Sequence, residues 1–310
     1  LVKKKMTDCF DGGHHAGTGI AGIVLFTIVL LVSILAIFRL PLLEKGKWFE
    51  PKQNYFWFVA FTCILDVPRY WMMALDDTYT CSSKTWTYSL HLLGNAAFFS
   101  SYSIICAMWQ DSVGAGKKIF LFTKPVLAFL NVLFLLLCIV GAGLCVTYPT
   151  IIAFFTSVFY SIYTIISAGK NVFFFSMIVW SGYSILKPLQ EARAHGHDEM
   201  LNERFRSIMI KLLSLMVVCA ITGTLRFLML LTKIAILHQK FSGRGYTGPF
   251  WWLLSDFIPR IIPTVSFMII MFGSLLIGRH QHRPSKLISV DKNMEFGSVS
   301  ESKESMIAFG

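Results

Sequence analysis

The sequence predicts an all-α, polytopic membrane protein built as a bundle of seven transmembrane helices. Of the 310 residues, 55% are hydrophobic and 15% are charged, whereas about a quarter of a soluble domain is charged. The charges collect in short stretches, separated by apolar runs of about 20 residues or more, the length that crosses a bilayer as a helix. Lysine and arginine are concentrated in alternate connections, as is typical of membrane proteins that follow the positive-inside rule.

Each apolar run defines one predicted span. The first apolar run is not followed by a small-residue cleavage site. We therefore expect that run to remain as a helix rather than to be removed as a signal peptide. The predicted spans are residues 18–38, 54–75, 87–109, 125–146, 151–186, 207–231 and 250–277. The chain accordingly divides into an N-terminal segment (1–17), a seven-transmembrane domain (18–278) and a Ser-rich tail (279–310).

The fifth span is the ambiguous one, because residues 151–186 could form two short helices or one long helix. The candidate break at residues 167–171 contains Gly169 but no proline. Two helices would have to reverse direction within about four residues, and each would be short for a bilayer. We predict a single long helix that extends beyond the bilayer, and hence seven spans rather than eight.

The distribution of basic residues predicts the orientation. The first, third and fifth connections and the start of the tail carry Arg39, Lys45, Lys47, Lys52, Lys117, Lys118, Lys124, Lys187, Arg193, Arg204, Arg206, Arg279, Arg283 and Lys286. The sixth connection, with Lys233, Lys240 and Arg244, and the N-terminal lysines disagree with this pattern. We expect the N-terminus outside or in a lumen and the C-terminus in the cytosol. The net charge of +11 then reflects orientation, and no nucleic-acid partner is expected.

We single out five of the charged residues inside the predicted spans, since a charge costs about 2.5–3.5 kcal/mol at a helix centre. Asp66 and Arg69 are three residues apart and Asp256 and Arg260 are four apart, so each pair shares a helix face. Arg226 has no acid near it in the sequence. The predicted topology allows all five to share one layer between the midplane and the outer surface. Because their charges sum to +1, another acid, a lipid headgroup or an anionic ligand could complete the set.

Two neutral polar residues, His91 and Asn95, lie four apart on the third span and could join that layer. Prolines at 68, 259 and 263 lie beside the charges, and each frees a backbone carbonyl that can line a polar cavity. Two interpretations stay open. The layer is either a packed network that only fixes the helices or a site for a ligand or ion.

The seven cysteines lack the spacing of metal ligands, so no metal or cofactor is expected. Cys9, Cys81 and Cys145 fall on or near the outer side, and two of them could pair if that side is oxidising. The sequence does not decide which two. The sequence contains no nucleophile elbow, phosphate-binding loop or metalloprotease helix.

The predicted topology invites comparison with rhodopsin-like receptors, but their signatures are absent. The third span ends Cys106-Ala-Met-Trp-Gln-Asp111, without an acid–Arg–aromatic triplet. The last span reads Ser255-Asp-Phe-Ile-Pro-Arg-Ile-Ile-Pro263, without an Asn-Pro-x-x-Tyr pattern. No lysine is present there to hold retinal.

Four segments resemble the plant tobamovirus-multiplication proteins, the THH/TOM family, and their seven-helix orphan-receptor-like relatives. They are Arg69-Tyr-Trp, the Leu-rich Leu92–Trp109 segment with Phe-Phe and a final Trp, Leu225-Arg226, and Asp256-Phe-Ile-Pro259. The long fifth span with Ala168-Gly169 is also similar, and the likeness covers most of residues 54–278. Arg260, and Asp256 in place of the usual Glu, depart from the family pattern.

The resemblance implies a non-enzymatic protein of the vacuolar or endolysosomal membrane. Such proteins act as platforms for cytosolic partners, including Arf-like small GTPases and, in infected plants, viral replication proteins. The docking surface would then include the loop with Lys187, Arg193, Arg204 and Arg206, although that loop could equally be a plain connector. A receptor-like sensor of a small ligand and a transporter or channel are the alternatives.

Overall fold

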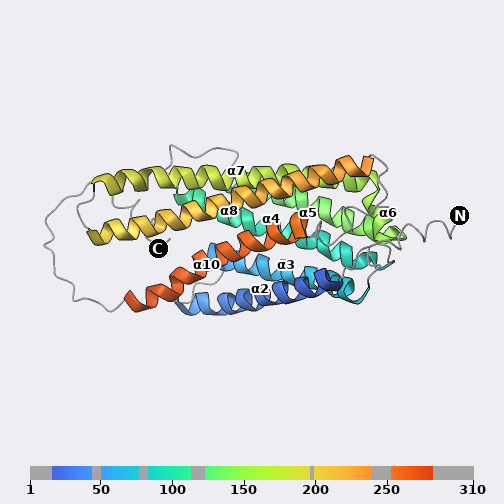
Figure 1. Cartoon of the computed structure of the whole chain (residues 1–310), viewed down its shortest axis with the longest axis horizontal. Coiled ribbons are helices and arrows are strands. Elements are labelled where there is room, and N and C mark those ends of the chain that lie inside the picture. Colours follow the sequence, from blue (N-terminus) through green and yellow to red (C-terminus); the bar gives the residue numbers. More distant parts are fainter. Residues whose placement is uncertain are drawn as a thin grey trace.

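The computed structural model describes residues 16–43, 50–76, 83–112, 123–195, 199–238 and 253–281, and within these ranges it is helical, without strands (Figure 1). The helices are α2 (Ala16–Leu43), α3 (Pro51–Leu75), α4 (Thr85–Ser112), α5 (Lys124–Thr147), α6 (Ile151–Phe155), α7 (Val158–His195), α8 (Glu199–His238), the π-helix η4 (Leu253–Phe257) and α10 (Ile258–Gln281).

Seven of the described helices are long and apolar enough to cross a membrane. Their apolar spans are Ala16–Pro41, Pro51–Leu75, Thr85–Asp111, Lys124–Thr147, Val158–Lys187, Arg206–Thr232 and Leu253–Ile270. The prediction of an all-α chain with seven such helices is therefore confirmed for the described residues. They fit an integral, multi-pass membrane protein. Most of the predicted N-terminal segment (1–17) and tail (279–310) lies outside the described residues.

The helices pack as a bundle in which α2 begins and α10 ends at opposite ends (Figure 1). Contacts run from α2 to α3, α3 to α4 and α4 to α5, and then from α7 to α8 and α8 to α10. Helix α4 is central and also touches α7. In its most apolar stretch 72% of residues are buried, against 22% in α5 and 28% in α8. Polar residues on α4 are consequently placed in the interior.

Two glycines of α2 allow it to approach α3 closely. A Cβ atom at Gly19 would lie 2.3 Å from the backbone nitrogen of Ala74, and one at Gly22 would lie 2.4 Å from the Tyr70 ring. Small residues permit this kind of close helix contact in membranes. The Phe26 ring then stacks on Tyr70 with centroids 5.0 Å apart, which fixes the side of α3 that carries the charges.

The fifth span differs in part from its prediction. Helix α7 runs without a break through residues 167–171, as expected for one long helix, but it begins at Val158 rather than at residue 151. Residues 151–155 form the separate α6, in which the Ala153 amide donates to Thr150 Oγ1 at 3.2 Å. The Tyr160 amide donates to Ser157 Oγ at 3.1 Å and so caps the start of α7. Hydropathy missed this break because the capping residues are small hydroxyl side chains within an apolar run.

The last span begins with a π-helical turn that contains Asp256. Such turns are rare and often occur at functional sites. Pro259 follows the turn and has no amide hydrogen for the helical ladder. The wider turn brings Asp256 to the interior, where 6% of its surface is exposed.

Candidate functional site

The seven polar residues that the sequence singles out in the membrane belong to one hydrogen-bonded network. It joins α3, α4, α8, η4 and α10, and each member is at least nine-tenths buried. The members are Asp66, Arg69, His91, Asn95, Arg226, Asp256 and Arg260.

Arg260 is at the centre of the network because it bridges both carboxylates. Its Nη1 donates to Asp256 Oδ1 at 3.2 Å, one turn earlier on the same face, and its Nη2 donates to Asp66 Oδ2 on α3. The guanidinium also lies over the rings of Phe26 and Phe98, 5.6 and 5.1 Å from their centroids. A planar guanidinium suits such a site since it can donate in several directions and stack at the same time.

Asp256 accepts from two residues of α3 as well. Arg69 Nη2 donates to its Oδ2 at 2.7 Å, and the Tyr70 hydroxyl donates to the same oxygen at 3.2 Å. The Arg69 guanidinium lies over the Tyr70 and Tyr88 rings, 5.0 and 5.8 Å from their centroids. Breaking a buried ion pair by removing one partner typically costs about 3–5 kcal/mol. Asp256 therefore ties the last span to α3.

His91 and Asn95 extend the network along α4. His91 Nδ1 lies 2.6 Å from Asp66 Oδ1, and its Nε2 lies 3.2 Å from Asn95 Nδ2. A neutral imidazole protonated on Nδ1 satisfies both contacts, because it donates to the carboxylate and accepts from the amide. Asn95 Nδ2 also donates to the Tyr163 hydroxyl at 3.0 Å, so α7 joins the network.

Arg226 is the exception within the network. Its Nη2 donates to the neutral Asn95 Oδ1 at 3.3 Å, and its guanidinium lies 5.2 and 5.3 Å from the centroids of Phe98 and Phe99. Its Nε and Nη1 have no hydrogen-bond partner in the described part of the chain. With Asp66 and Asp256 already bound by Arg69 and Arg260, one positive charge is left over at Arg226. No acid among the described residues pairs with Arg226, so the described network keeps the net charge of +1 that the sequence analysis noted.

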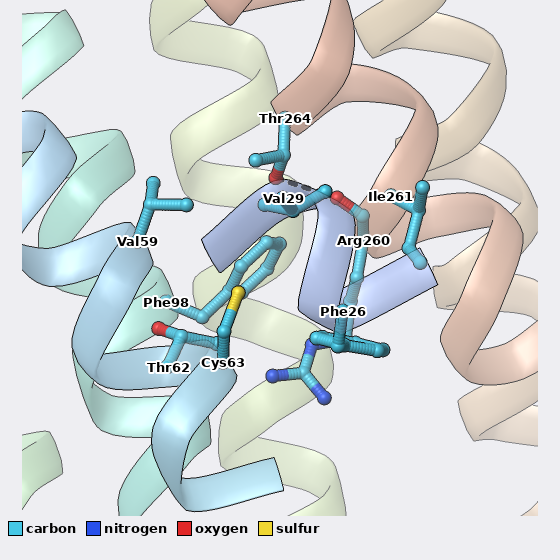
Figure 2. A pocket seen from close by; sticks show the side chains of 9 residues that line it. All are labelled: Phe26, Val29, Val59, Thr62, Cys63, Phe98, Arg260, Ile261 and Thr264. Carbon is cyan, nitrogen blue, oxygen red and sulfur yellow. Dashed lines mark hydrogen bonds between the residues drawn. The ribbon is translucent and has the colours of Figure 1, made fainter. Parts of the chain in front are cut away.

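A small cavity adjoins Arg260 (Figure 2). Its volume is about 20 Å³, which is enough for about one water molecule and far below the roughly 300 Å³ of the smaller ligand pockets. Figure 2 shows Arg260 on one side and Val59 and Thr62 of α3 on the other. The cavity is consistent with the interpretation of the layer as a packed polar network.

The predicted docking residues lie at one end of the bundle. Lys187 on α7 and Arg206 on α8 are exposed. Arg193 and Arg204 belong to the same two helices, but their side chains lie outside the described part.

The possible disulfide stays a prediction, because of its three candidate cysteines the structure describes only Cys145. It is a free, buried thiol whose Sγ points into the α4–α5 interface and donates to the Thr85 carbonyl oxygen at 3.5 Å. Cys9 and Cys81 lie outside the described residues. Among the described residues, no group of three His, Cys, Asp or Glu side chains is placed to hold a metal ion.

Sequence reasoning missed one charged residue inside the membrane, Lys170. It belongs to the candidate break at residues 167–171, which is helical as one long helix requires, and it donates to Asn131 Oδ1 of α5 at 3.0 Å. Its ammonium lies 4.1, 5.1 and 5.4 Å from the ring centroids of Phe134, Phe99 and Phe174. A lysine near the middle of the predicted span 151–186 was the available signal. The contacts of Tyr70 and Tyr163 were also missed, because tyrosines carry no charge to mark them.

No protein-family model matches the chain, and no curated protein matches it. The resemblance to the THH/TOM family therefore stays a prediction.

Proposed function

We propose that the protein is a non-enzymatic, seven-transmembrane scaffold that recruits cytosolic proteins to a vacuolar or endolysosomal membrane. The THH/TOM resemblance suggests the membrane and suggests Arf-like small GTPases as partners. The observation that carries the proposal is that α7 and α8 continue as helices beyond their apolar spans. We name this projection, residues 187–195 and 199–206, the α7–α8 hairpin.

The hairpin is long enough to present a surface outside the hydrocarbon core. Helix α7 ends at His195, while its apolar span ends at Lys187, a continuation of about 12 Å at 1.5 Å per residue. Helix α8 begins at Glu199, while its span begins at Arg206, which adds about 10 Å. In Figure 1 this end of α7 and α8 reaches past the ends of α2 and α3.

The composition of the hairpin suits protein contacts. It carries charges of both signs, namely Lys187, Glu191, Arg193, Glu199, Glu203, Arg204 and Arg206. Lys187, Glu191 and Arg206 are exposed. Because helices hold their side chains in a fixed arrangement, a partner can bind with a smaller loss of conformational entropy than a flexible loop would require.

The hairpin faces the cytosol in this proposal. It lies at the same end of the bundle as the end of α10 (Figure 1). This is the end that the basic connections assign to the cytosol by the positive-inside rule. The N-terminus then lies outside or in the lumen.

A second candidate function, a receptor-like sensor of a small anionic ligand, is favoured by one observation. Arg226 is a buried guanidinium with two nitrogens that have no partner in the described part. Against it, the described cavity has room for about one water molecule. A sensor would change partner binding or nucleotide exchange only when ligand is added, whereas a scaffold recruits its partner without one.

Proximity labelling tests the proposal in the native cell, with the labelling enzyme fused to the C-terminal tail. The wild-type chain is compared with the double variant Lys187→Ala/Arg206→Ala. Lys124→Ala is the matched control, because Lys124 is an exposed lysine that is not part of the hairpin and pairs with Asp111 at 2.7 Å. We expect labelled small GTPases on a vacuolar or endolysosomal membrane with the wild type and the control, and their loss with the double variant. Labelling of lumenal proteins, or labelling unchanged by the double variant, would contradict the proposal.

A further inference from the structure

Lys170 lies deep in the membrane. It is the thirteenth residue of the span Val158–Lys187, about 18 Å from the start of α7 at 1.5 Å per residue. The hydrocarbon core is about 30 Å thick. The ammonium group therefore lies near the middle of the bilayer, where a charge is expensive and usually has a partner.

The partners of Lys170 in the described chain are neutral. Its Nζ donates to Asn131 Oδ1 at 3.0 Å, and the same oxygen accepts from Ser103 Oγ at 3.0 Å. Three phenylalanine rings surround the ammonium on its inner side. No described carboxylate forms an ion pair with it. Two ammonium hydrogens and the Asn131 amide hydrogens are left as unused donors among the described residues.

These donors lie at the outer surface of the bundle rather than in its core. Lys170 and Asn131 are both partly exposed, and within four positions of them along the same helices Leu133, Ile166 and Val172 are exposed apolar side chains. Gly169, next to Lys170, is also exposed, and a Cβ there would meet no atom within 4 Å. The α5–α7 face thus combines a cation, an amide and an open backbone position that another helix can approach closely.

We infer that this α5–α7 face docks a transmembrane helix of another membrane protein that carries an aspartate or glutamate near its centre. A carboxylate at that depth would accept from the Lys170 ammonium and the Asn131 amide, and would supply the missing negative charge. Charge-assisted hydrogen bonds of this kind are stronger than neutral ones.

Charge complementarity selects this occupant. A second copy of the chain on the same face would bring two lysines together, and their repulsion is large in a low dielectric. The acidic groups of lipids stay at the interface, about 15 Å from the centre of a 30 Å core. A transmembrane helix, in contrast, can carry a carboxylate at any depth. The inference concerns the membrane-facing side and does not depend on the α7–α8 hairpin.

A defined peptide tests the inference without knowledge of the natural partner. The full chain, labelled with a fluorescent acceptor, is reconstituted in phosphatidylcholine vesicles with a donor-labelled, Leu-rich transmembrane peptide bearing one central Glu. Peptides with Gln or Leu at that position serve as references. We expect the Glu peptide to bind wild-type protein about tenfold more tightly than the Leu peptide, the effect of about one interhelical polar contact.

Variants of the chain assign the effect to Lys170. Lys170→Met should abolish the preference for the Glu peptide, and Lys170→Arg should retain it. Lys124→Met, which alters an exposed lysine at the start of α5, should have no effect. If Lys170→Met fails to fold, Asn131→Leu replaces it and should weaken the preference.

Three results would overturn the inference. The first is equal binding of the Glu and Leu peptides. The second is a spin-labelled fatty acid that binds in a Lys170-dependent way while the Glu peptide does not, which would assign the site to a lipid carboxylate. The third is energy transfer between two labelled copies of the chain that disappears in Lys170→Met, which would assign the face to self-association.

Discussion

Charged side chains in the membrane occupy two different settings. In the interior, Asp256 accepts from Arg69 at 2.7 Å and from Arg260 at 3.2 Å, so both guanidiniums are paired with a carboxylate of the same chain, and Arg226 is the interior exception in the described part. On the α5–α7 face, Lys170 has an amide oxygen and aromatic rings as partners, without a described carboxylate. Charges that are neutralised within the bundle hold its helices together. A charge at the lipid face without a carboxylate partner is suited to bind an acidic residue of another membrane protein.

The largest expected effect is at Asp256. Asp256→Asn removes a carboxylate that accepts from Arg69, Arg260 and Tyr70. We expect the free energy of unfolding to fall by about 3–5 kcal/mol, because two buried guanidiniums lose a counter-charge. Unfolding is followed with a thiol-reactive dye in a Cys9→Ser/Cys81→Ser background, because the five described cysteines are buried and free. A loss below about 1 kcal/mol would mean that the pairs contribute little.

Tyr70→Phe tests the same carboxylate with a smaller change. It removes one hydrogen bond of 3.2 Å to Asp256 and keeps the ring that stacks on Phe26. The expected loss in unfolding free energy is about 1 kcal/mol, the usual contribution of one hydrogen bond or slightly more for a charged acceptor. A loss as large as that of Asp256→Asn would mean that the hydroxyl, and not the ion pairs, dominates the site.

Arg226→Met separates the uncompensated guanidinium from the paired ones. Its guanidinium makes one 3.3 Å hydrogen bond to a neutral amide and leaves two nitrogens unpaired in the described part. Replacing such a buried group by an apolar side chain of similar size should change the free energy of unfolding by less than about 1 kcal/mol, or raise it. If the free energy of unfolding instead falls by about 3 kcal/mol or more, the loss typical of a broken buried ion pair, Arg226 has an acidic partner elsewhere in the protein.

The smallest effect on stability is expected at the hairpin. Lys187→Ala/Arg206→Ala alters two exposed side chains and should shift the free energy of unfolding by no more than about 0.5 kcal/mol per substitution. A larger shift in the same dye assay would mean that the hairpin is part of the packed bundle, and would remove the basis for using this variant to test recruitment alone.

The seven spans could be predicted because each is set by length and composition, which are local properties. The network members could be picked out because charge in an apolar run is costly, and because the i,i+3 and i,i+4 spacings place Asp66 with Arg69 and Asp256 with Arg260 on common faces. Their partners could not be predicted. The bridge from Arg260 to Asp66 spans 194 residues of sequence and depends on how α10 packs against α3.

Other misses have local causes. The α6–α7 break rests on hydroxyl caps at Thr150 and Ser157, which hydropathy does not weigh. Cys145 lies near the end of its span, as the sequence predicts, but the burial of its thiol against Thr85 depends on the rotation of α5, which the sequence does not show. The helix through Gly169 and Lys170 is continuous as predicted, but the contacts of Lys170 could not be predicted because they depend on how α5 packs against α7.

The contrast between the two settings is tested most directly by measuring the unfolding free energies of Asp256→Asn and Lys170→Met side by side in the same membrane mimetic. The account predicts a loss of about 3–5 kcal/mol for Asp256→Asn and of less than about 1 kcal/mol for Lys170→Met. Equal losses, or the larger loss at Lys170, would contradict the assignment of the interior charges to structure and of the lipid-facing lysine to a partner.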